Sequence, residues 1–472
     1  MSLMDVARGA YVRSPTVVRR SLAPFVALVP TRAKFGATYR NWRERIAAAA
    51  ANPAIAADEH IAALRALLLK AHAGSPFYHD AIDRAFGPAF DLSTAEPADL
   101  RRLPILGKAD LAAAGEAVLA VPHSTLDVAE TSGSNAERPF TFYLDKDRSA
   151  REMAFVYDVW SRVGFDEQQS RACFRGFGLD PKGLRIHEWE PALRELKLSV
   201  FPMTNEDASV YLDLIDERRI QYLYGYVSAL ELFCRHIAAL GRAPKLPIKG
   251  ILPISEPIYE HQRRLIRQVL GDVPFACFYG LSEKVLFAAE LPGRPGVYAF
   301  NPLYGLAELV DAAGQPVLEP GQAGRLVGTG FLTTGMPFIR YDTGDSARLV
   351  ELPTPANGQK LVVEGLMPRR KPDYLVASDG NRVVTTDLTP EDPRLFGRIE
   401  EFQFFQDTPG EVVIRFIPAA GSGSADAEKL AAFLGARTHG GIRFTVAQVE
   451  RIAAGRDGKR AFIDQRLDFN RY

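Results

Sequence analysis

The sequence predicts an α/β protein in which a large N-terminal domain is followed by a small α+β C-terminal domain. The chain has 472 residues, whereas one domain usually has about 100 to 200, so two or three hydrophobic cores are expected. Its middle part alternates apolar, strand-like runs with amphipathic helical segments, which is typical of parallel α/β units. A stiff, basic connector at Gly365 to Pro372 separates this part from the end of the chain.

The beginning of the chain is predicted to be mostly helical. Apolar residues recur at helical spacing between Ala57 and Ala73, and Gly74-Ser75-Pro76 supplies a stop signal. A second, shorter helix is expected after Lys108. Residues 1–110 are therefore interpreted as a helical prelude within an N-terminal domain that spans residues 1–367.

Strands and helices are expected to alternate over the next part of the chain. The predicted segments are, in order, a strand at 140–144, a helix at 152–163, a strand at 220–223, a helix at 228–240, a strand at 248–254, a helix at 258–270 and a strand at 275–278. From Leu306 onward, short strands with Gly and Pro turns predict an antiparallel closing region. Strands at 374–377, 401–406 and 412–417 and a helix at 425–434 predict the C-terminal domain, residues 368–472.

Composition argues against several classes of protein. The 57 basic and 57 acidic side chains cancel, so nucleic acid is not expected as a partner. Cys173, Cys234 and Cys277 lack the paired spacing of a zinc site or a disulfide framework, which favours a reducing, cytoplasmic location. The apolar stretch Leu22 to Val29 is too short to span a bilayer, so no transmembrane segment is expected. We interpret it as part of an N-terminal arm rather than of a cleaved signal.

The first chemical motif is Thr131-Ser132-Gly133-Ser134-Asn135, which lies between two strand-like runs. A loop of this kind offers hydroxyls and unencumbered backbone N–H groups to the oxygens of a triphosphate. Serine, glycine and asparagine also fill ordinary surface turns, so the motif alone carries little weight. Its position ahead of two further motifs makes it a candidate for ATP binding.

Two later segments supply candidates for binding the rest of a nucleotide. Tyr279-Gly280-Leu281-Ser282-Glu283 follows the strand predicted at 275–278, and the ends of parallel strands are where ligands bind. Within it, the tyrosine is a candidate for packing against adenine and Glu283 for holding Mg²⁺. In the acidic loop Arg340 to Asp345, the carboxylate of Asp345 is expected to accept both ribose hydroxyls. Asp342 has the alternative role of a turn former.

A lysine near the end of the chain is the candidate for the chemical step. Lys459 lies in the glycine-containing segment Gly455 to Arg460. A mobile ammonium ion can stabilise the charge that develops between a carboxylate and the α-phosphate of ATP. Read alone, the same segment is a basic hairpin tip.

The order of these motifs resembles the adenylate-forming superfamily of acyl-CoA synthetases, in its phenylacetate-CoA ligase and CapK-like branch. The resemblance covers nearly the whole chain and includes Ser75 to Tyr78 and Leu103 to Lys108, which are similar to the helical prelude of that branch. It implies a large multilayer N-terminal domain of sheets and helices with a small α+β C-terminal lid. It also implies ATP, Mg²⁺ and coenzyme A as ligands, with a small-molecule carboxylic acid as substrate.

The resemblance further implies roles for individual residues. Arg340 and Lys459 would be catalytic, Arg370 would lie near the ribose, and Asp373 would be the hinge of the lid. Nucleotide contacts would also come from Ser255 and Glu256, and acid contacts from Tyr224, Gly225 and Tyr226.

Several alternatives stay open. The acceptor of the acyl group could be coenzyme A, an amine, a carrier-protein thiol or a protein cysteine, or the enzyme could transfer AMP itself. The phosphate loop continues with Asn135-Ala136-Glu137-Arg138-Pro139, where relatives have Thr-Gly-Lys-Pro. The change either weakens ATP binding or gives Arg138 the role of the lysine, and a catalytically inactive member is the least favoured alternative. The acid and the oligomeric state, with a homodimer as one arrangement, are not specified.

The acid pocket is the least accessible part of the prediction. Aromatic residues such as Phe174, Tyr222 and Tyr224 are candidates for lining it, although packing in the core is the favoured interpretation. Arg175, with Arg185 and His187, is a candidate for recognising a second polar group, with surface solvation as the favoured alternative.

Overall fold

The computed structural model describes residues 35–130, 140–175, 179, 185–200, 203–367, 374–384, 399–418, 423–452 and 463–467. Its first described part is helical and contains α4 (Gly36–Ala51), α5 (Pro53–Gly74), α6 (Pro76–Phe86) and α7 (Lys108–Ala114). Asn52 and Ser75 each accept a backbone N–H at the start of α5 and α6, and a proline follows each cap. The described part of the predicted prelude is therefore helical, and α5 ends at the predicted stop.

The largest sheet described has seven antiparallel strands in the order β11-β12-β13-β14-β10-β9-β8. Its strands are β8 (Phe278–Gly280), β9 (Phe287–Leu291), β10 (Arg294–Phe300), β11 (Gly305–Val310), β12 (Ala323–Gly330), β13 (Tyr341–Glu351) and β14 (Val362–Met367). The sheet shares a core with α5 and α6, where Leu64, Tyr78 and Phe338 are almost completely buried. The antiparallel region predicted after Leu306 is confirmed.

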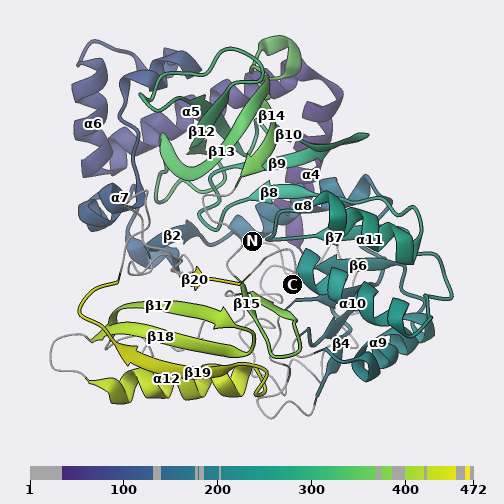
Figure 1. Ribbon diagram of the computed structural model, residues 1–472. Helices are drawn as coiled ribbons and strands as arrows, with labels where there is room; N and C mark the ends of the chain where they lie inside the picture. Colours follow the sequence, from purple (N-terminus) through teal and green to yellow (C-terminus); the bar gives the residue numbers. More distant parts are fainter. Residues whose placement is uncertain are drawn as a thin grey trace.

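A second sheet carries the parallel α/β units. It contains β3 (Arg171–Phe174), β4 (His187–Glu190), β5 (Glu195–Leu198), β6 (Tyr222–Gly225) and β7 (Gly250–Pro253), in the order β4-β5-β3-β6-β7. All pairs are parallel except β4 with β5. The helices of this region are α8 (Arg148–Ser161), α9 (Asn205–Glu217), α10 (Val227–Ala239) and α11 (Glu260–Leu270). Figure 1 shows α9, α10 and α11 on the outer side of this sheet.

The C-terminal part has a separate core. Its elements are β15 (Tyr374–Val376), β16 (Arg382–Val384), β17 (Ile399–Thr408), β18 (Glu411–Pro418), α12 (Ser424–Arg437), β19 (Arg443–Gln448) and β20 (Ile463–Gln465). Leu375, Phe404, Ile414 and Leu430 pack together in it, and Figure 1 shows α12 below the sheet of β17 to β20. The strands and the helix predicted here are present. The boundary between residues 367 and 368 stays a prediction.

Two predictions about the nucleotide motifs need correction. The strand expected at 275–278 in the parallel sheet is not there, because Phe275 forms only one bridge to Ile251 and β8 begins at Phe278 in the antiparallel sheet. The prediction of a loop at Arg340 to Asp345 is also wrong, because Tyr341 to Asp345 form the first part of β13. Gly344 has φ 77°, and the register of β13 with β12 shifts beside it, so this stretch of strand contains a β-bulge.

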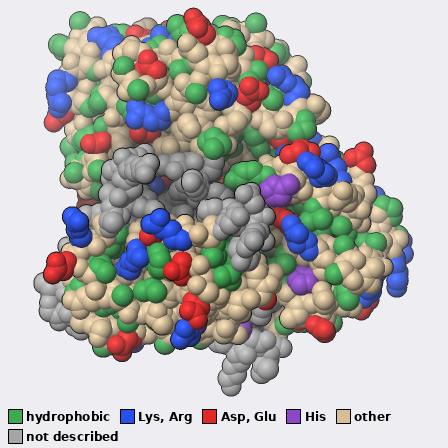
Figure 2. Space-filling model, viewed as in Figure 1, with side chains coloured by type: hydrophobic (Ala, Val, Ile, Leu, Met, Phe, Trp, Pro, Cys, Tyr) green, Lys and Arg blue, Asp and Glu red, His purple; other side chains and the backbone are tan. Residues whose placement is uncertain are grey.

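The surface of the described residues has no dominant charge on the face that Figure 2 shows. Lysine and arginine side chains are interspersed there with aspartate and glutamate, in agreement with the zero formal net charge of the whole sequence. All three cysteines are buried and free, as their spacing predicts. No described helix combines the length and the apolar character needed to cross a bilayer.

Candidate active site

A cavity of about 1610 Å³ lies where the two large sheets meet. One wall comes from β8, the turn after it and β13, and the opposite wall from α8 and the parallel strands β3, β5 and β6. The hairpin of β1 (Leu126–Glu130) and β2 (Thr141–Asp145) contributes Thr141 and Tyr143. The cavity is large enough for a nucleotide together with a small acid, since ligand pockets commonly have about 300 to 1,000 Å³.

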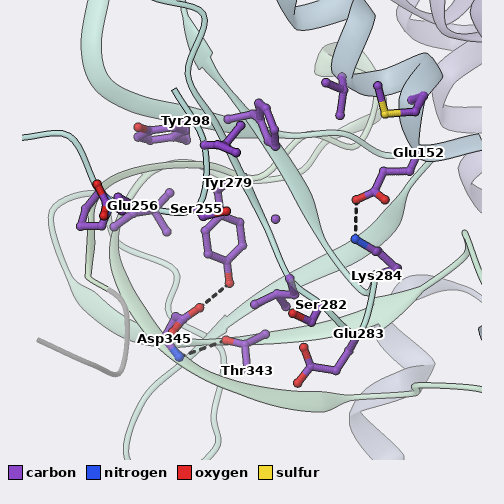
Figure 3. A pocket seen from close by; sticks show the side chains of 18 of the residues that line it. Glu152, Ser255, Glu256, Tyr279, Ser282, Glu283, Lys284, Tyr298, Thr343 and Asp345 are labelled. Atoms are coloured by element: carbon purple, nitrogen blue, oxygen red, sulfur yellow. Dashed lines mark hydrogen bonds and ion pairs between the residues drawn. The ribbon is translucent and has the colours of Figure 1, made fainter. Parts of the chain in front are cut away.

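Asp345 and Tyr279 form the centre of the first wall. The hydroxyl of Tyr279 donates to Oδ2 of Asp345 at 2.6 Å, and both residues line the cavity (Figure 3). Burial, followed by the charge of Asp345, raises the pKa of the Tyr279 hydroxyl well above its usual range, so it remains a donor at neutral pH. This geometry holds the Asp345 carboxylate in place beside an aromatic ring, as binding of ribose and adenine would require.

Glu283 supplies a second carboxylate close to this pair. Its Oε1 accepts from the hydroxyl of Tyr341 at 2.8 Å and lies 3.3 Å from Nζ of Lys108. The residue is buried and lines the cavity. A carboxylate that lines the cavity suits Mg²⁺, which is typically held by one or two carboxylates and by substrate phosphates. Glu283 therefore fits the predicted metal role.

Lys108 was not among the sequence candidates, and its position depends on a contact between distant parts of the chain. Leu106 bridges Tyr341 in parallel, with Leu106 N donating to Arg340 O and Asp342 N donating to Leu106 O. This short pairing brings the start of α7 beside β13. As a result, Lys108 reaches Glu283 across more than 170 positions of sequence, a relation that no local pattern indicates.

The structure places Arg340, predicted to lie near the reacting centre, in an ion pair away from the cavity lining. Its guanidinium group is buried, pairs with Glu308 at 3.0 Å, and donates to the carbonyl oxygen of Leu103 at 2.7 Å. It is not among the residues that line the cavity. The backbone φ of 49° at Arg340 places it outside the regular strand that follows, and the side chain packs toward the prelude instead. Arg340 thus stabilises the position of the segment before Lys108 through its hydrogen bond to Leu103.

Ser255 and Glu256, which were predicted to contact the nucleotide, follow β7 and differ in their surroundings. Ser255 lines the cavity and adopts a left-handed φ of 62°, a strained conformation that is frequent at binding sites. Glu256 also lines the cavity, but its two carboxylate oxygens accept from the backbone N and the hydroxyl of Ser228. Because Ser228 is in the first turn of α10, Glu256 stabilises that helix terminus. A direct nucleotide contact from Glu256 stays a prediction.

Of the three residues predicted to contact the acid, only Tyr224 lines the cavity. Gly225 has φ 147° and lies so close to β3 that a Cβ there would be 2.1 Å from Phe174 O. Tyr226 is buried in the core at the start of α10. Of the further aromatic candidates, Phe174 packs on Phe233 inside the core. Gly225 and Tyr226 therefore shape the fold around the pocket.

Other members of the predicted site have the following outcomes. Gly280, Leu281 and Ser282 line the cavity together with Tyr279 and Glu283. Thr131, Ser132, Gly133, Ser134, Asn135, Arg370, Asp373 and Lys459 lie outside the described residues. Residues that the sequence did not single out are Thr343, Glu152 and Lys284, and the last two form an ion pair of 2.8 Å (Figure 3).

Comparison with solved structures finds a similar fold. The structure is similar to that of 2-hydroxyisobutyryl-CoA ligase in complex with 2-HIB-AMP and CoA in the thioesterification state. The TM-score is 0.53 and the identity 18%, over 87% of this chain and 90% of that one. At this identity the likeness shows the fold alone.

Sequence comparison also finds related proteins. The chain is 22% identical to protein CapK of Staphylococcus aureus over 324 residues, 68% of this chain and 70% of that protein. It is 26% identical to phenylacetate-coenzyme A ligase of Pseudomonas putida over 327 residues, 66% of this chain and 70% of that protein. No protein-family model matches. Both matches support the resemblance of the chain to the adenylate-forming superfamily, in its phenylacetate-CoA ligase and CapK-like branch.

Proposed function

We propose that the protein is an ATP- and Mg²⁺-dependent ligase that adenylates a carboxylic acid and transfers the acyl group to coenzyme A. The observation that carries the proposal is the convergence of Asp345, Tyr279 and Glu283 on one cavity. In the first step a carboxylate oxygen attacks the α-phosphorus of ATP and pyrophosphate leaves. In the second step the thiol of coenzyme A, after losing its proton, attacks the acyl carbonyl and AMP leaves.

Each described residue contributes a separate function in this scheme. Asp345, oriented by the Tyr279 hydroxyl, accepts hydrogen bonds from the ribose, and the Tyr279 ring packs against the base. Glu283 holds Mg²⁺, which would neutralise phosphate charge when bound. Lys108 and Tyr341 fix the Glu283 carboxylate from its other side.

The charges around the cavity support the need for a metal ion and a further cation. On the wall formed by β8 and β13, the described lining contains Glu283 and Asp345, and the nearby Lys108 and Lys284 are already in ion pairs with Glu283 and Glu152. A triphosphate would therefore face an excess of negative charge. Mg²⁺ on Glu283 and the ammonium group of Lys459 are the proposed means of offsetting it. A reducing, cytoplasmic location belongs to the same proposal.

ATP–pyrophosphate exchange with a panel of carboxylic acids tests the first step. Exchange should depend on an acid and on Mg²⁺ and should fall at least about 100-fold in Lys459→Ala. Lys429→Ala is the matched control, because Lys429 is an exposed lysine on α12. No exchange with any acid, together with no ATP binding, would refute adenylation.

The same panel, repeated with coenzyme A, tests the second step. Mass analysis should find an acyl-CoA thioester and free AMP. An acyl-AMP that accumulates equally with and without coenzyme A would instead favour an amine, a carrier protein or a protein cysteine as the acceptor. Transfer of AMP to a phosphate or hydroxyl group would identify an adenylyltransferase.

A further inference from the structure

Two histidines and an aspartate lie together where α5 meets α6, outside the cavity. His72 is in the last turn of α5, whereas His79 and Asp83 are four positions apart on α6 and therefore share one face of that helix. Ser75 ends α5 and also caps α6, so the turn that brings the two helices together is short. Figure 1 shows α6 at the edge of the molecule, and none of the three side chains is among those that line the cavity.

The polar atoms of these side chains have the spacing of a metal site. Nε2 of His72 is 2.8 Å from Oδ1 of Asp83, and Nε2 of His79 is 3.4 Å from Oδ2. Among the residues that the structure describes, they are the group of three histidine, cysteine or acidic side chains whose ligand atoms all lie within 4.8 Å of one another. In a tetrahedral zinc site the ligand atoms are about 3.4 Å apart. Small side-chain rotations are therefore sufficient for one ion to contact all three.

A backbone contact fixes the position of the proton on His79. Its Nδ1 is 3.0 Å from the carbonyl oxygen of His72, and because a carbonyl oxygen can only accept, Nδ1 carries the proton. In the neutral ring, Nε2 then presents a lone pair to the carboxylate of Asp83, which is unfavourable unless a cation lies between them. The same backbone bond orients the ring, as the outer partners of zinc-bound histidines do.

A metal ion satisfies this arrangement better than protons do. The rings of His72 and His79 are stacked, with centroids 4.3 Å apart, so protonation of both would place two positive charges side by side. One divalent ion would instead face both imidazole nitrogens and the carboxylate. Imidazole ligands favour Zn²⁺ over Mg²⁺, which prefers oxygen ligands.

We propose that His72, His79 and Asp83 bind one Zn²⁺ ion that links the end of α5 to α6, at a site separate from the Mg²⁺ site at Glu283. The three side chains are between 32% and 51% exposed, which leaves room for water as a fourth ligand.

The surroundings of the site indicate a structural role for the ion. Tyr78, which precedes His79, donates its hydroxyl to Pro337 O at 3.0 Å, and Lys70 of α5 donates to Thr334 Oγ1 at 2.7 Å. Both helices thus contact the segment that leads into β13. A zinc ion that binds the folded protein and holds α5 against α6 should raise its stability.

Calorimetric titration of the full-length protein with ZnCl₂ tests the proposal. The protein carries no histidine tag and is first treated with a chelator, and excess MgCl₂ occupies sites made of oxygen ligands. The three cysteines are buried, so they are not expected to compete in the folded protein. One zinc ion should bind with a dissociation constant of about 1 µM, more weakly than in structural sites with four protein ligands. A dissociation constant above about 100 µM would overturn the proposal.

Substitutions then assign the ion to these side chains. His79→Gln and Asp83→Asn should each weaken zinc binding at least about tenfold, since even the loss of an outer partner of a metal ligand typically costs about 10- to 100-fold. His123→Gln is the matched control and should keep the affinity of the wild type. His123 is an exposed histidine 3.4 Å from the carboxylate of Glu116, and it belongs to no three-ligand group among the described residues.

Thermal unfolding gives a second readout and shows whether each variant is folded. ZnCl₂ should raise the midpoint of unfolding of the wild type and of His123→Gln, and it should not raise that of His79→Gln or Asp83→Asn. Wild-type zinc affinity in folded His79→Gln and Asp83→Asn would contradict the site. These measurements need neither ATP nor an acid, so their outcome is independent of the proposed function.

Discussion

Removal of the Tyr279 hydroxyl is a sensitive perturbation of the nucleotide wall. Tyr279→Phe keeps the ring that is proposed to contact adenine and deletes only the donor to Asp345 Oδ2, which is 2.6 Å away. A hydrogen bond to a charged group contributes about 1.5 to 3 kcal/mol. Water in the cavity can replace part of it, so the lower limit applies, which corresponds to a roughly tenfold weaker ATP affinity.

Isothermal titration with ATP and Mg²⁺ measures this effect directly, and thermal unfolding monitors the fold. Tyr211→Phe is the matched control, because the Tyr211 hydroxyl donates to Ser199 O at 2.7 Å in a site that does not line the cavity. Both variants should lose a similar amount of stability, about 1 kcal/mol. Only Tyr279→Phe should weaken ATP binding.

The reasoning would be refuted by an ATP affinity of Tyr279→Phe within twofold of the wild type in a folded protein. In that case Asp345 either does not contact the nucleotide or needs no hydroxyl to orient it. Measurement of Asp345→Asn separates these two explanations, since only the first predicts no effect for that variant as well.

Three other perturbations have defined outcomes. Glu283→Gln should lower the rate of adenylation by about 100-fold and weaken its dependence on Mg²⁺ in steady-state assays, because the proposed metal ligand loses its charge. An unchanged dependence on Mg²⁺ would contradict the role of Glu283 as a metal ligand. Gly225→Ala should cost about 3 kcal/mol or more in urea unfolding, since a Cβ would meet Phe174 O at 2.1 Å and φ is 147°. The control Gly435→Ala, which lies in α12 with open space around it, should instead raise the free energy of unfolding by up to about 1 kcal/mol. Burial lowers the pKa of His60 below 6.5, so the folded state resists protonation of this residue. The free energy of unfolding should therefore fall as the pH drops below about 6.5, by at most about 1.4 kcal/mol per pH unit. His60→Gln should flatten this pH dependence, and an unaltered slope would show that other groups cause it.

The parts of the fold that were predictable have strong local periodicity. Helices α5, α10 and α11 have an apolar face that repeats at helical spacing, and each was predicted within a few residues of its bounds. By contrast, β3 and β5 each have four residues, too few for alternation to distinguish them from loops. Their missed assignment also hid the pairing of Arg171 with Glu195, which exists only because those strands are neighbours.

The candidate site shows the same division between local and long-range information. Tyr279 to Glu283 were predicted from one short motif, and all five residues line the cavity. Lys108 and the pair of Glu152 with Lys284 were missed, because each depends on segments that are more than 100 positions apart in the sequence. A single sequence contains the residues of such contacts but no local pattern that connects them.

The acidic motif shows how neighbouring residues acquire different roles. Tyr341, Thr343 and Asp345 are alternate residues of β13 and lie on the same side of it, where Tyr341 donates to Glu283 and the other two line the cavity. Arg340 precedes the strand and is instead bound to Glu308 and to the carbonyl oxygen of Leu103. Since the chain from Leu103 to Leu106 leads directly into Lys108, we expect Arg340 to influence the site by positioning that lysine against Glu283. Loss of Arg340 should therefore resemble loss of Lys108 in its effect on adenylation, with an added loss of stability from the unpaired Glu308.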